Sequence, residues 1–348
     1  MKRCIALLLA ALICLSGCGK QKNPEPKGKS YFTYFDTVSY VFSYAGDSDK
    51  AFDANCAAAS ETLGRYHRLF DIYHEYADMN NLCTLNRLAG ESVPLEDELL
   101  AFLQEAKDMY TLTNGQMNVM LGSVLRLWHE AREAASADPA AAYVPSDEQL
   151  REAARHTGID LLEIDPEAGT ARIRDPEAAI DVGAFGKGYA VERAAEALRA
   201  RGAEGYVLNI GGNIRAIGTR PDGSGWSTGI RDPLEPEGAF ALHIRIADVA
   251  CVSSGVYERY FTAAGTRYHH IIDPDSLYPA DCYASITVLA GDSGLADALS
   301  TALFCMDYEE SSALVASLEG VEACWIFPDG SVRSSPGFAA LIEEAKEP

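Results

Sequence analysis

The chain has 348 residues, is 48% hydrophobic and carries a formal net charge of −22 at pH 7. An acidic surface of this kind disfavours binding to nucleic acid and to anionic lipid headgroups, so a phosphate-bearing ligand needs a site built locally from metal and backbone amides. The length beyond the first thirty residues is enough for one large domain or two closely packed ones, and we expect one continuous unit over residues 31–340.

The N-terminus predicts export from the cytoplasm. Lys2 and Arg3 precede an apolar run at residues 5–15, which predicts a signal peptide over residues 1–17. The ending Leu-Ser-Gly-Cys resembles a bacterial lipobox, so Cys18 is expected to be the lipidated first residue of the mature protein. An ordinary signal peptide with a chance cysteine is the alternative.

The following segment, residues 18–30, is rich in Pro, Gly and Lys and predicts a polar tether. No later apolar run approaches the roughly 20 residues that a transmembrane helix needs. We therefore expect a lipid anchor on the extracytoplasmic face of a bacterial cell membrane. Six cysteines follow the tether, an even number that permits disulfides, but none has Cys-x-x-Cys spacing and Cys305 and Cys324 stand in apolar runs. Buried free thiols are therefore favoured over disulfides.

The first half of the folded part predicts one strand followed by helices. Alternating aromatic and β-branched residues predict a strand over 34–42. Apolar residues at spacings of three and four predict helices over residues 49–69, 95–113 and 124–135. Asn114-Gly115 is a stop signal for the helix over 95–113. A further helix is expected to begin at residue 146, where Ser146 and Gln149 form an N-cap pattern.

A glycine-rich stretch at residues 180–201 is the centre of the prediction. A short apolar approach ends at Asp181, three glycines follow, and an Ala-rich helix begins, which predicts a strand, a turn and a helix. Such a loop can offer backbone groups to a phosphate or a metal, with Lys187 as a point charge and Asp181 as a hydrogen-bond acceptor. A tight turn without a ligand is the alternative.

The second half predicts hairpins and a polar helix face. Alternating runs that meet at Gly-Gly predict a hairpin over 206–218, and a strand is expected over 284–290. Asp292 or Ser293 then caps a helix on which Asp297 and Thr301 share one face. Carboxylate and hydroxyl oxygens suit a hard cation such as Mg²⁺. The other interpretation of Asp297 is a charge near the helix N-terminus.

Two adjacent histidines, His269 and His270, are expected in a strand that ends at Ile-Ile-Asp-Pro, with His269 on the opposite face from His270. A lone buried histidine is usually structural, but a pair before an Asp-Pro turn points to a functional site. One of them could accept a proton during catalysis.

The glycine-rich stretch resembles the Asp-x-Gly-x-x-Ala-Lys-Gly-Tyr-Ala signature of the ApbE family. Further resemblances are Asn-x-Gly-Gly-Asn at 209–213 and His-Ile-Ile-Asp-Pro at 270–274, and together they extend from about residue 34 to about 330. The family comprises FAD:protein FMN transferases. The resemblance implies an α+β fold of mixed sheets with hairpins and packed helices, related to the T-fold.

The resemblance also implies site residues. Asn118 departs from the family pattern by replacing an acid, and Ser276-Leu277 replaces Thr-Gly, which predicts a differently shaped turn. The implied catalytic base, or group that orients the acceptor hydroxyl, is His270. Magnesium is implied at Ala184 (by its carbonyl), Asp297, Ser300 and Thr301. Contacts to FAD are implied for Phe35, Tyr73, Gln116, Met117, Asn118, Asp181, Lys187 and Ile272.

The resemblance implies that FMN moves from FAD to a Ser or Thr hydroxyl of an extracytoplasmic flavoprotein, with release of AMP. This chain lacks the acceptor motif, Asp-x-x-Ser/Thr-Gly-Ala-Ser/Thr, so modification is expected in trans. Two alternatives remain at this stage. One is a magnesium-dependent FAD pyrophosphatase on the same site, and the other is a flavin-binding lipoprotein without enzymatic activity.

Overall fold

The computed structural model describes residues 24–235 and 238–343. The predicted signal peptide, Cys18 and most of the expected tether lie outside these residues. The end of the expected tether, however, belongs to the fold. The first strand, β1 (Lys27–Tyr34), begins before residue 31 because its backbone pairs with the next strand along most of its length.

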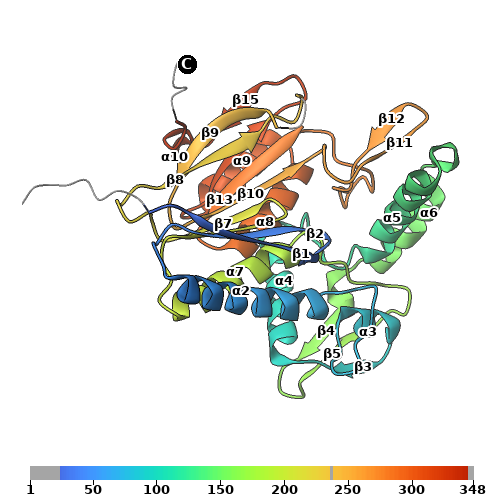
Figure 1. The fold of residues 1–348 in the computed structure, drawn as a ribbon. Helices are drawn as coiled ribbons and strands as arrows, with labels where there is room; N and C mark the ends of the chain where they lie inside the picture. Colours follow the sequence, from blue (N-terminus) through green and yellow to red (C-terminus); the bar gives the residue numbers. More distant parts are fainter. Residues whose placement is uncertain (1–23, 236–237, 344–348) are drawn as a thin grey trace, which may run out of the picture.

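One sheet of eight strands is the centre of the molecule (Figure 1), and every pairing in it is antiparallel. The predicted strand over 34–42 proves to be parts of two strands, because Phe35 and Asp36 adopt positive φ angles of 54° and 51° and turn the chain back. The sheet runs in the order β1, β2 (Thr37–Ser43), β6 (Tyr206–Ile210), β7 (Asn213–Ile217), β10 (Ala250–Gly255), β13 (Ser285–Ala290), β14 (Glu322–Ile326) and β15 (Val332–Ser334).

Helices cover one face of this sheet. The predicted helix over 49–69 is confirmed as α2 (Asp49–Leu69), which packs against α7 (Gly186–Ala200). α7 in turn packs against α8 (Ser293–Ala302), and α8 lies on β10 and β13. Asp292 caps α8 by accepting a hydrogen bond from the Leu295 amide at 2.9 Å, as the sequence predicts. Further helices are α3 (Leu82–Arg87), α4 (Asp97–Leu112) and α9 (Tyr308–Ser317).

A separate hairpin and a short helix cover the other face. Because both faces of β13 are covered, all six of its residues are buried, and its sequence is a continuous apolar run apart from Ser285 and Thr287. Alternate residues of β14 enter different cores: Trp325 belongs to the larger core, while Cys324 and Ile326 belong to the smaller. The covering elements are β8 (Trp226–Arg231), β9 (Phe240–Ile246) and α10 (Pro336–Ala339).

A third core lies at the end of the molecule where α5 (Gly122–Ala137) and α6 (Asp147–Ala153) stand side by side (Figure 1). Trp128 of α5 stacks against Tyr268 of the hairpin formed by β11 (Phe261–Ala263) and β12 (Thr266–Tyr268). The predicted capping box of Ser146 and Gln149 is present at the start of α6. A small sheet of β3 (Ser92–Pro94), β5 (Thr170–Ile173) and β4 (Leu162–Asp165) completes the fold.

Two predicted strands are absent. The approach to Asp181 makes only an isolated bridge, between Leu121 and Ala179, and His269 and His270 follow β12 outside any strand. The other expected elements are confirmed, including the helix that ends at Asn114-Gly115, the hairpin over 206–218 and the strand over 284–290. The architecture is therefore α+β, as predicted.

The cysteines of the described chain are all free thiols, as the sequence favours. Cys56, Cys251 and Cys324 are buried, Cys305 is partly buried and Cys282 is exposed. Burial raises the pKa of the Cys251 and Cys324 thiols to about 12, so both are protonated at neutral pH. Within residues 24–235 and 238–343, none of the helices combines the length and the apolar character that crossing a membrane requires.

Candidate active site

A large cavity, of about 1060 Å³, opens between the sheet, the N-terminal end of α7, and α5. Its size is at the upper end of the range usual for small-molecule sites. Of its lining residues, six are lysine or arginine and five are aspartate or glutamate, whereas the whole chain has 29 basic against 51 acidic residues. The cavity is therefore far less acidic than the rest of the protein, which suits a ligand that carries phosphate.

A side chain helps to hold the loop before α7, in addition to backbone hydrogen bonds from the Asp181 amide to Val119 and from the Gly122 amide to Ala179. Asn86 of α3 accepts a hydrogen bond from the Ile180 amide at 2.7 Å and donates one to the Ile180 carbonyl at 2.9 Å. The next residue, Asp181, accepts from the Gly183 amide at 2.8 Å. Burial raises the pKa of the Asp181 carboxyl above its ordinary value, although His129 and Arg259 act in the opposite direction. A ligand N–H that faces this carboxyl would favour its charged form.

Gly188 is a residue of α7 at which this helix packs closely against α8. A Cβ atom at this position would lie 2.3 Å from the carbonyl oxygen of Ser293 and 2.4 Å from Cβ of Asp297, so only glycine permits this approach. The Gly188 amide donates a 2.7 Å hydrogen bond to Oδ2 of Asp297. The sequence led us to expect that all three glycines of the loop let the backbone approach a ligand. For Gly188 the structure gives another reason, the contact between two helices.

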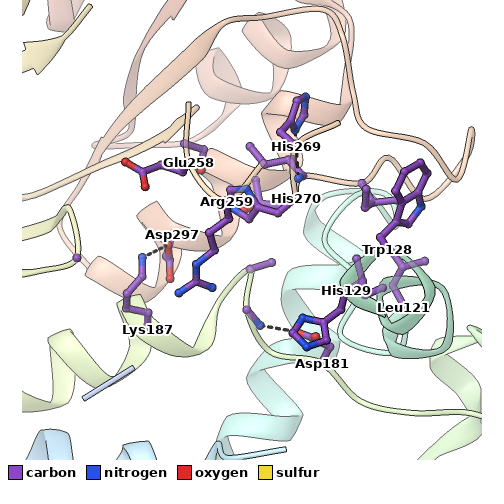
Figure 2. A pocket seen from close by; sticks show the side chains of 18 of the residues that line it. Leu121, Trp128, His129, Asp181, Lys187, Glu258, Arg259, His269, His270 and Asp297 are labelled. Carbon is purple, nitrogen blue, oxygen red and sulfur yellow. Dashed lines mark hydrogen bonds and ion pairs between the residues drawn. The ribbon is translucent and has the colours of Figure 1, made fainter. Parts of the chain in front are cut away.

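Lys187 and Asp297 face each other across this helix contact. The Lys187 ammonium lies 3.8 Å from Oδ1 of Asp297 (Figure 2). It also donates a 2.7 Å hydrogen bond to Oδ1 of Asn213, which stands at the start of β7. Both side chains line the cavity, and Asp297 is only 5% exposed. The position of Asn213 after Gly-Gly is therefore explained by its contact with Lys187 as well as by the turn.

The donor groups around Asp297 fit a magnesium ion. Asp297, Thr301 and Ala184 all line the cavity, and together they offer carboxylate, hydroxyl and carbonyl oxygens. In the part of the chain that the structure describes, no three His, Cys, Asp or Glu side chains come close enough to hold a metal. A single carboxylate is nevertheless typical of Mg²⁺, which keeps several waters and binds substrate phosphates directly.

Ser300, the fourth predicted metal ligand, is placed differently. Its side chain is fully buried, its hydroxyl donates to the Asp297 carbonyl at 3.0 Å, and it shares a 2.8 Å hydrogen bond with Ser254. It is not among the residues that line the cavity. The Ser300 hydroxyl therefore links α8 to β10, and its role at a metal stays a prediction.

The two histidines have different surroundings. His269 is buried, with Nε2 at 2.8 Å from the Ala280 carbonyl and Nδ1 accepting from the Ile271 amide at 3.3 Å, so both ring nitrogens are occupied. His270 is exposed to the cavity beside Arg259, while the His269 ring points away from it (Figure 2). Crowding by surrounding protein atoms and the charge of Arg259 lower the pKa of His270 well below 6.5. His270 is therefore neutral at pH 7 and able to accept a proton.

The predicted FAD-binding residues Tyr73, Gln116, Asn118 and Ile272 also line the cavity. The Tyr73 side chain is 59% exposed and its ring lies 5.6 Å from that of His129, so it offers an aromatic surface at the cavity edge. Gln116 donates a 2.8 Å hydrogen bond to Asp275, which lies 159 residues further along the chain. An exposed aromatic ring of this kind can stack on a planar ligand.

Asn118 has a structural function that an acid could not fulfil. Its amide nitrogen donates to the Thr157 carbonyl at 2.9 Å, and its amide oxygen accepts from the Met120 amide at 2.9 Å. An ionised aspartate would have no proton to donate to Thr157. The Asn118 side chain, at the position where the family usually has an acid, thus links the loop before α5 to the segment after α6.

Phe35 and Met117 are not brought to the cavity wall. The Phe35 ring packs edge-on against His67 of α2 at 5.5 Å, and the cavity is lined instead by its neighbours Asp36 and Thr37. Met117 is fully buried in the main core. The backbone amides of both residues are occupied as well, by Nδ1 of His67 for Phe35 and by Oγ1 of Thr113 for Met117.

The turn after Ile-Ile-Asp-Pro keeps a glycine-like backbone without a glycine. Leu277 has a φ of 66°, and its amide donates a 2.8 Å hydrogen bond to the Asp273 carbonyl. The Leu277 carbonyl accepts from the Trp128 indole at 2.9 Å, which fixes the turn against α5. Leu277 thus takes the left-handed conformation that glycine adopts readily, and the expectation of a differently shaped turn stays a prediction.

Several groups at the site were not predicted. His129 and Arg132 of α5 line the cavity 2.8 Å apart, and Asn86 holds the loop before Asp181. No role was predicted for these three residues, because their function depends on which segments meet in space. Arg259 also lines the cavity, within the stretch Tyr-Glu-Arg-Tyr-Phe at residues 257–261.

Known proteins resemble this chain in sequence and in fold. The family model described as the ApbE family matches residues 35–325. An FAD:protein FMN transferase of Treponema pallidum is 34% identical over 282 residues, which cover 76% of this chain and 75% of that protein. The crystal structure of an ApbE protein from Thermotoga maritima covers 92% of this chain and is itself covered completely, with a TM-score of 0.80 and 27% identity.

A second solved structure, the flavin transferase ApbE of Vibrio cholerae, has a TM-score of 0.75 and 25% identity, and the match covers 91% of this chain and 99% of that one. The sequence matches and the shared fold both extend over nearly the whole described chain, so they include the glycine-rich loop, the histidine segment and α8. This chain belongs to the ApbE family.

Proposed function

We propose that this protein is a magnesium-dependent FAD:protein FMN transferase, which moves FMN from FAD to a Ser or Thr hydroxyl of a second, extracytoplasmic protein and releases AMP. The transferase class is that of its relatives, which are FAD:protein FMN transferases. The proposal goes beyond this class in three points: the dependence on magnesium, the release of AMP and the extracytoplasmic location of the acceptor.

One observation carries the proposal: the Lys187–Asp297 pair and the exposed, neutral His270 line the same cavity. A bound magnesium ion on Asp297, Thr301 and the Ala184 carbonyl would supply charge stabilisation for the diphosphate of FAD. Lys187 adds one positive charge on the same wall. Phosphoryl transfer to a hydroxyl requires groups that stabilise the charge of the phosphates and, apart from them, a base that accepts the hydroxyl proton.

His270 would take the proton of the acceptor hydroxyl. As this proton leaves, the hydroxyl oxygen forms a bond to the FMN-side phosphorus, and the bond from that phosphorus to the bridging oxygen breaks. The bridging oxygen leaves with AMP. The reaction depends mainly on positioning and charge, because a dissociative transition state of this kind needs little covalent assistance from the protein.

A direct test combines the purified protein, FAD, Mg²⁺ and a candidate acceptor, followed by mass spectrometry. We expect the acceptor to gain one FMN, one AMP to appear for each FMN transferred, and EDTA to stop both. The matched control is the same acceptor with its Ser or Thr replaced by Ala. Free FMN without a modified acceptor would instead identify an FAD pyrophosphatase, and FMN on this chain itself would identify a self-modifying flavin carrier.

We further propose that Cys18 anchors the protein by lipid on the extracytoplasmic face of the membrane. The support is the sequence around Cys18, since this residue lies outside the described part of the chain. Replacement of Cys18 by Ala should move the protein from the membrane fraction to the soluble fraction. Retention in the membrane after a carbonate wash would contradict the anchor.

A further inference from the structure

Arg259 has an unusual backbone conformation beside the cavity. Its φ is 40°, in the left-handed region that residues other than glycine, asparagine and aspartate rarely adopt. The segment before it is fixed from both sides: the Val256 amide donates to the Ala284 carbonyl at 3.0 Å, and the Tyr257 ring lies 4.1 Å from the Arg231 guanidinium. Backbone strain of this kind persists only where the surroundings impose it, and it gathers at functional sites.

The Arg259 side chain is available to a ligand. It lines the cavity and is exposed, and within residues 24–235 and 238–343 no hydrogen bond or ion pair engages its guanidinium group. Two other cations of the cavity wall, Lys187 and Arg87, have partners, and Arg87 pairs with Glu75 at 2.7 Å. Lys187 donates to Asn213, and the buried Arg215 forms an ion pair with Glu192 at 2.8 Å. A guanidinium that the fold exposes without a partner suits an anionic ligand.

The guanidinium also lies at the centre of the predicted chemistry. In Figure 2 it extends between the Lys187–Asp297 pair and Asp181, while its backbone lies next to His270. The pKa directions agree with this position, because the charge of Arg259 lowers the pKa of both His270 and Asp181. The other charged or titratable groups that act on His270 are His269 and Arg132.

We propose that Arg259 is a catalytic residue that binds the non-bridging oxygens of the phosphoryl group in transfer. This inference rests on the proposed function and specifies one more of its parts. Lys187 stands on the α7–α8 wall, whereas Arg259 reaches toward the same phosphate from the His270 side. Its planar fork can donate two parallel hydrogen bonds to two phosphate oxygens, which a lysine ammonium cannot do.

The bond changes are those of the proposed reaction, and Arg259 exchanges no proton. The acceptor oxygen bonds to phosphorus, its proton passes to His270, and the bridging oxygen departs with AMP. Arg259 keeps its positive charge throughout and stabilises the negative charge that gathers on the non-bridging oxygens. Its placement beside His270 also favours the neutral base, which can accept the proton.

The position of Arg259 can be tested without FAD. In wild-type protein and in the Arg259→Gln variant, the pKa of His270 is measured by NMR on protein with isotope-labelled histidine. We expect the pKa of His270 to rise in the variant, because a neighbouring positive charge is removed. Arg267→Gln is the matched control, since Arg267 lies over the Tyr260 ring and does not line the cavity. An unchanged pKa of His270 in Arg259→Gln would contradict the placement of the Arg259 guanidinium beside His270, on which the proposal depends.

Its catalytic role is tested by steady-state kinetics with FAD and the acceptor. We expect Arg259→Gln to lower kcat by about 10²- to 10³-fold, as loss of a preorganised charge-stabilising donor does, with a much smaller change in KM for FAD. Arg259→Lys should retain the pKa of His270 but still lose turnover, because it keeps the charge and lacks the fork. A loss confined to KM, or full activity in Arg259→Lys, would contradict the proposed role.

These measurements distinguish a failure of the proposed function from a failure of the inference about Arg259. Absence of transfer by the wild-type protein would refute the proposed function, while the NMR titration would still establish whether Arg259 acts on His270. Normal wild-type transfer with an unaffected Arg259→Gln variant would refute only the inference about Arg259. Far-UV circular dichroism of each variant verifies that the fold is retained.

Discussion

The cavity wall formed by α7 and α8 differs from the wall formed by α5 and residues 256–278 in how its polar groups are held. On the first wall, the polar side chains are paired within the protein, Asp297 with the Gly188 amide and Lys187 with Asn213. Behind this wall, Glu192 pairs with Arg215. Asp297, Glu192 and Arg215 are buried, and Lys187 is partly buried. Their positions are therefore fixed before any ligand arrives.

The second wall exposes its functional groups to the cavity. His270 and Arg259 are both exposed, and Arg259 and Leu277 have left-handed backbones. The comparison teaches that one wall combines ligand binding with the stability of the fold, while the other provides reactive groups whose removal leaves the core intact. Substitutions should therefore affect folding and function together on the first wall, and function alone on the second.

The largest effect on turnover is expected from Asp297→Asn. The amide can still accept the hydrogen bond from Gly188, so the fold should be retained, but the one carboxylate of the proposed magnesium site is lost. We expect loss of several kcal/mol of charge stabilisation, or about 10³-fold in turnover, measured with and without added Mg²⁺. Asp297→Ala should in addition destabilise the fold, because it leaves the buried Gly188 amide without its acceptor. Wild-type turnover in EDTA would contradict the metal assignment.

His270→Asn tests the second wall. We expect kcat to fall by about 10²- to 10⁴-fold, with FAD affinity and unfolding free energy close to those of the wild type. The wild-type pH profile supplies a second measurement. Since the pKa of His270 is lowered, the base stays neutral through pH 6.5, and kcat should fall only at lower pH, as His270 becomes protonated. A loss of activity centred near pH 6.5 would contradict the environment described for His270.

Glu192→Ala is expected to act mainly on stability. Glu192 accepts hydrogen bonds from Arg215 and from the Ser293 amide at the start of α8, both at 2.8 Å, and it is 4% exposed. Its removal leaves a buried arginine without its partner, at a cost of about 3–5 kcal/mol. Chemical denaturation measures this change. Glu196→Ala on the exposed face of α7 is the control, and an equal effect of the two variants would break the contrast between the walls.

The smallest effect is expected from Leu277→Gly. Glycine relieves the left-handed strain at this position but removes a partly buried side chain from the core around Trp128. The strain relieved and the apolar burial lost are of similar size, so we expect the unfolding free energy to change by less than about 1 kcal/mol. Leu127→Ala, in the same core with ordinary helical backbone, should cost more. A larger loss in Leu277→Gly would indicate that its backbone is not strained.

Local patterns in the sequence determined much of the fold. The helix over 49–69, the capping box at Ser146 and the Gly-Gly hairpin at 211–212 were all correct, because spacing, capping and turn chemistry act between neighbouring residues. Most of the predicted site residues also reach one cavity, since the family motifs that contain them mark its wall.

The tertiary structure decided what depends on residues far apart in the chain. Asn86 replaces a strand partner for Ile180 across 94 residues, and Gly188 is required by a helix 109 residues away. Phe35, Met117 and Ser300 turn away from the cavity because the packing of α2, the main core and β10 engages them first. Arg259 could be given a role only when its exposed guanidinium was seen beside His270. A side chain's direction and the pKa of its neighbours follow from packing and from charges in space, which spacing along the sequence does not specify.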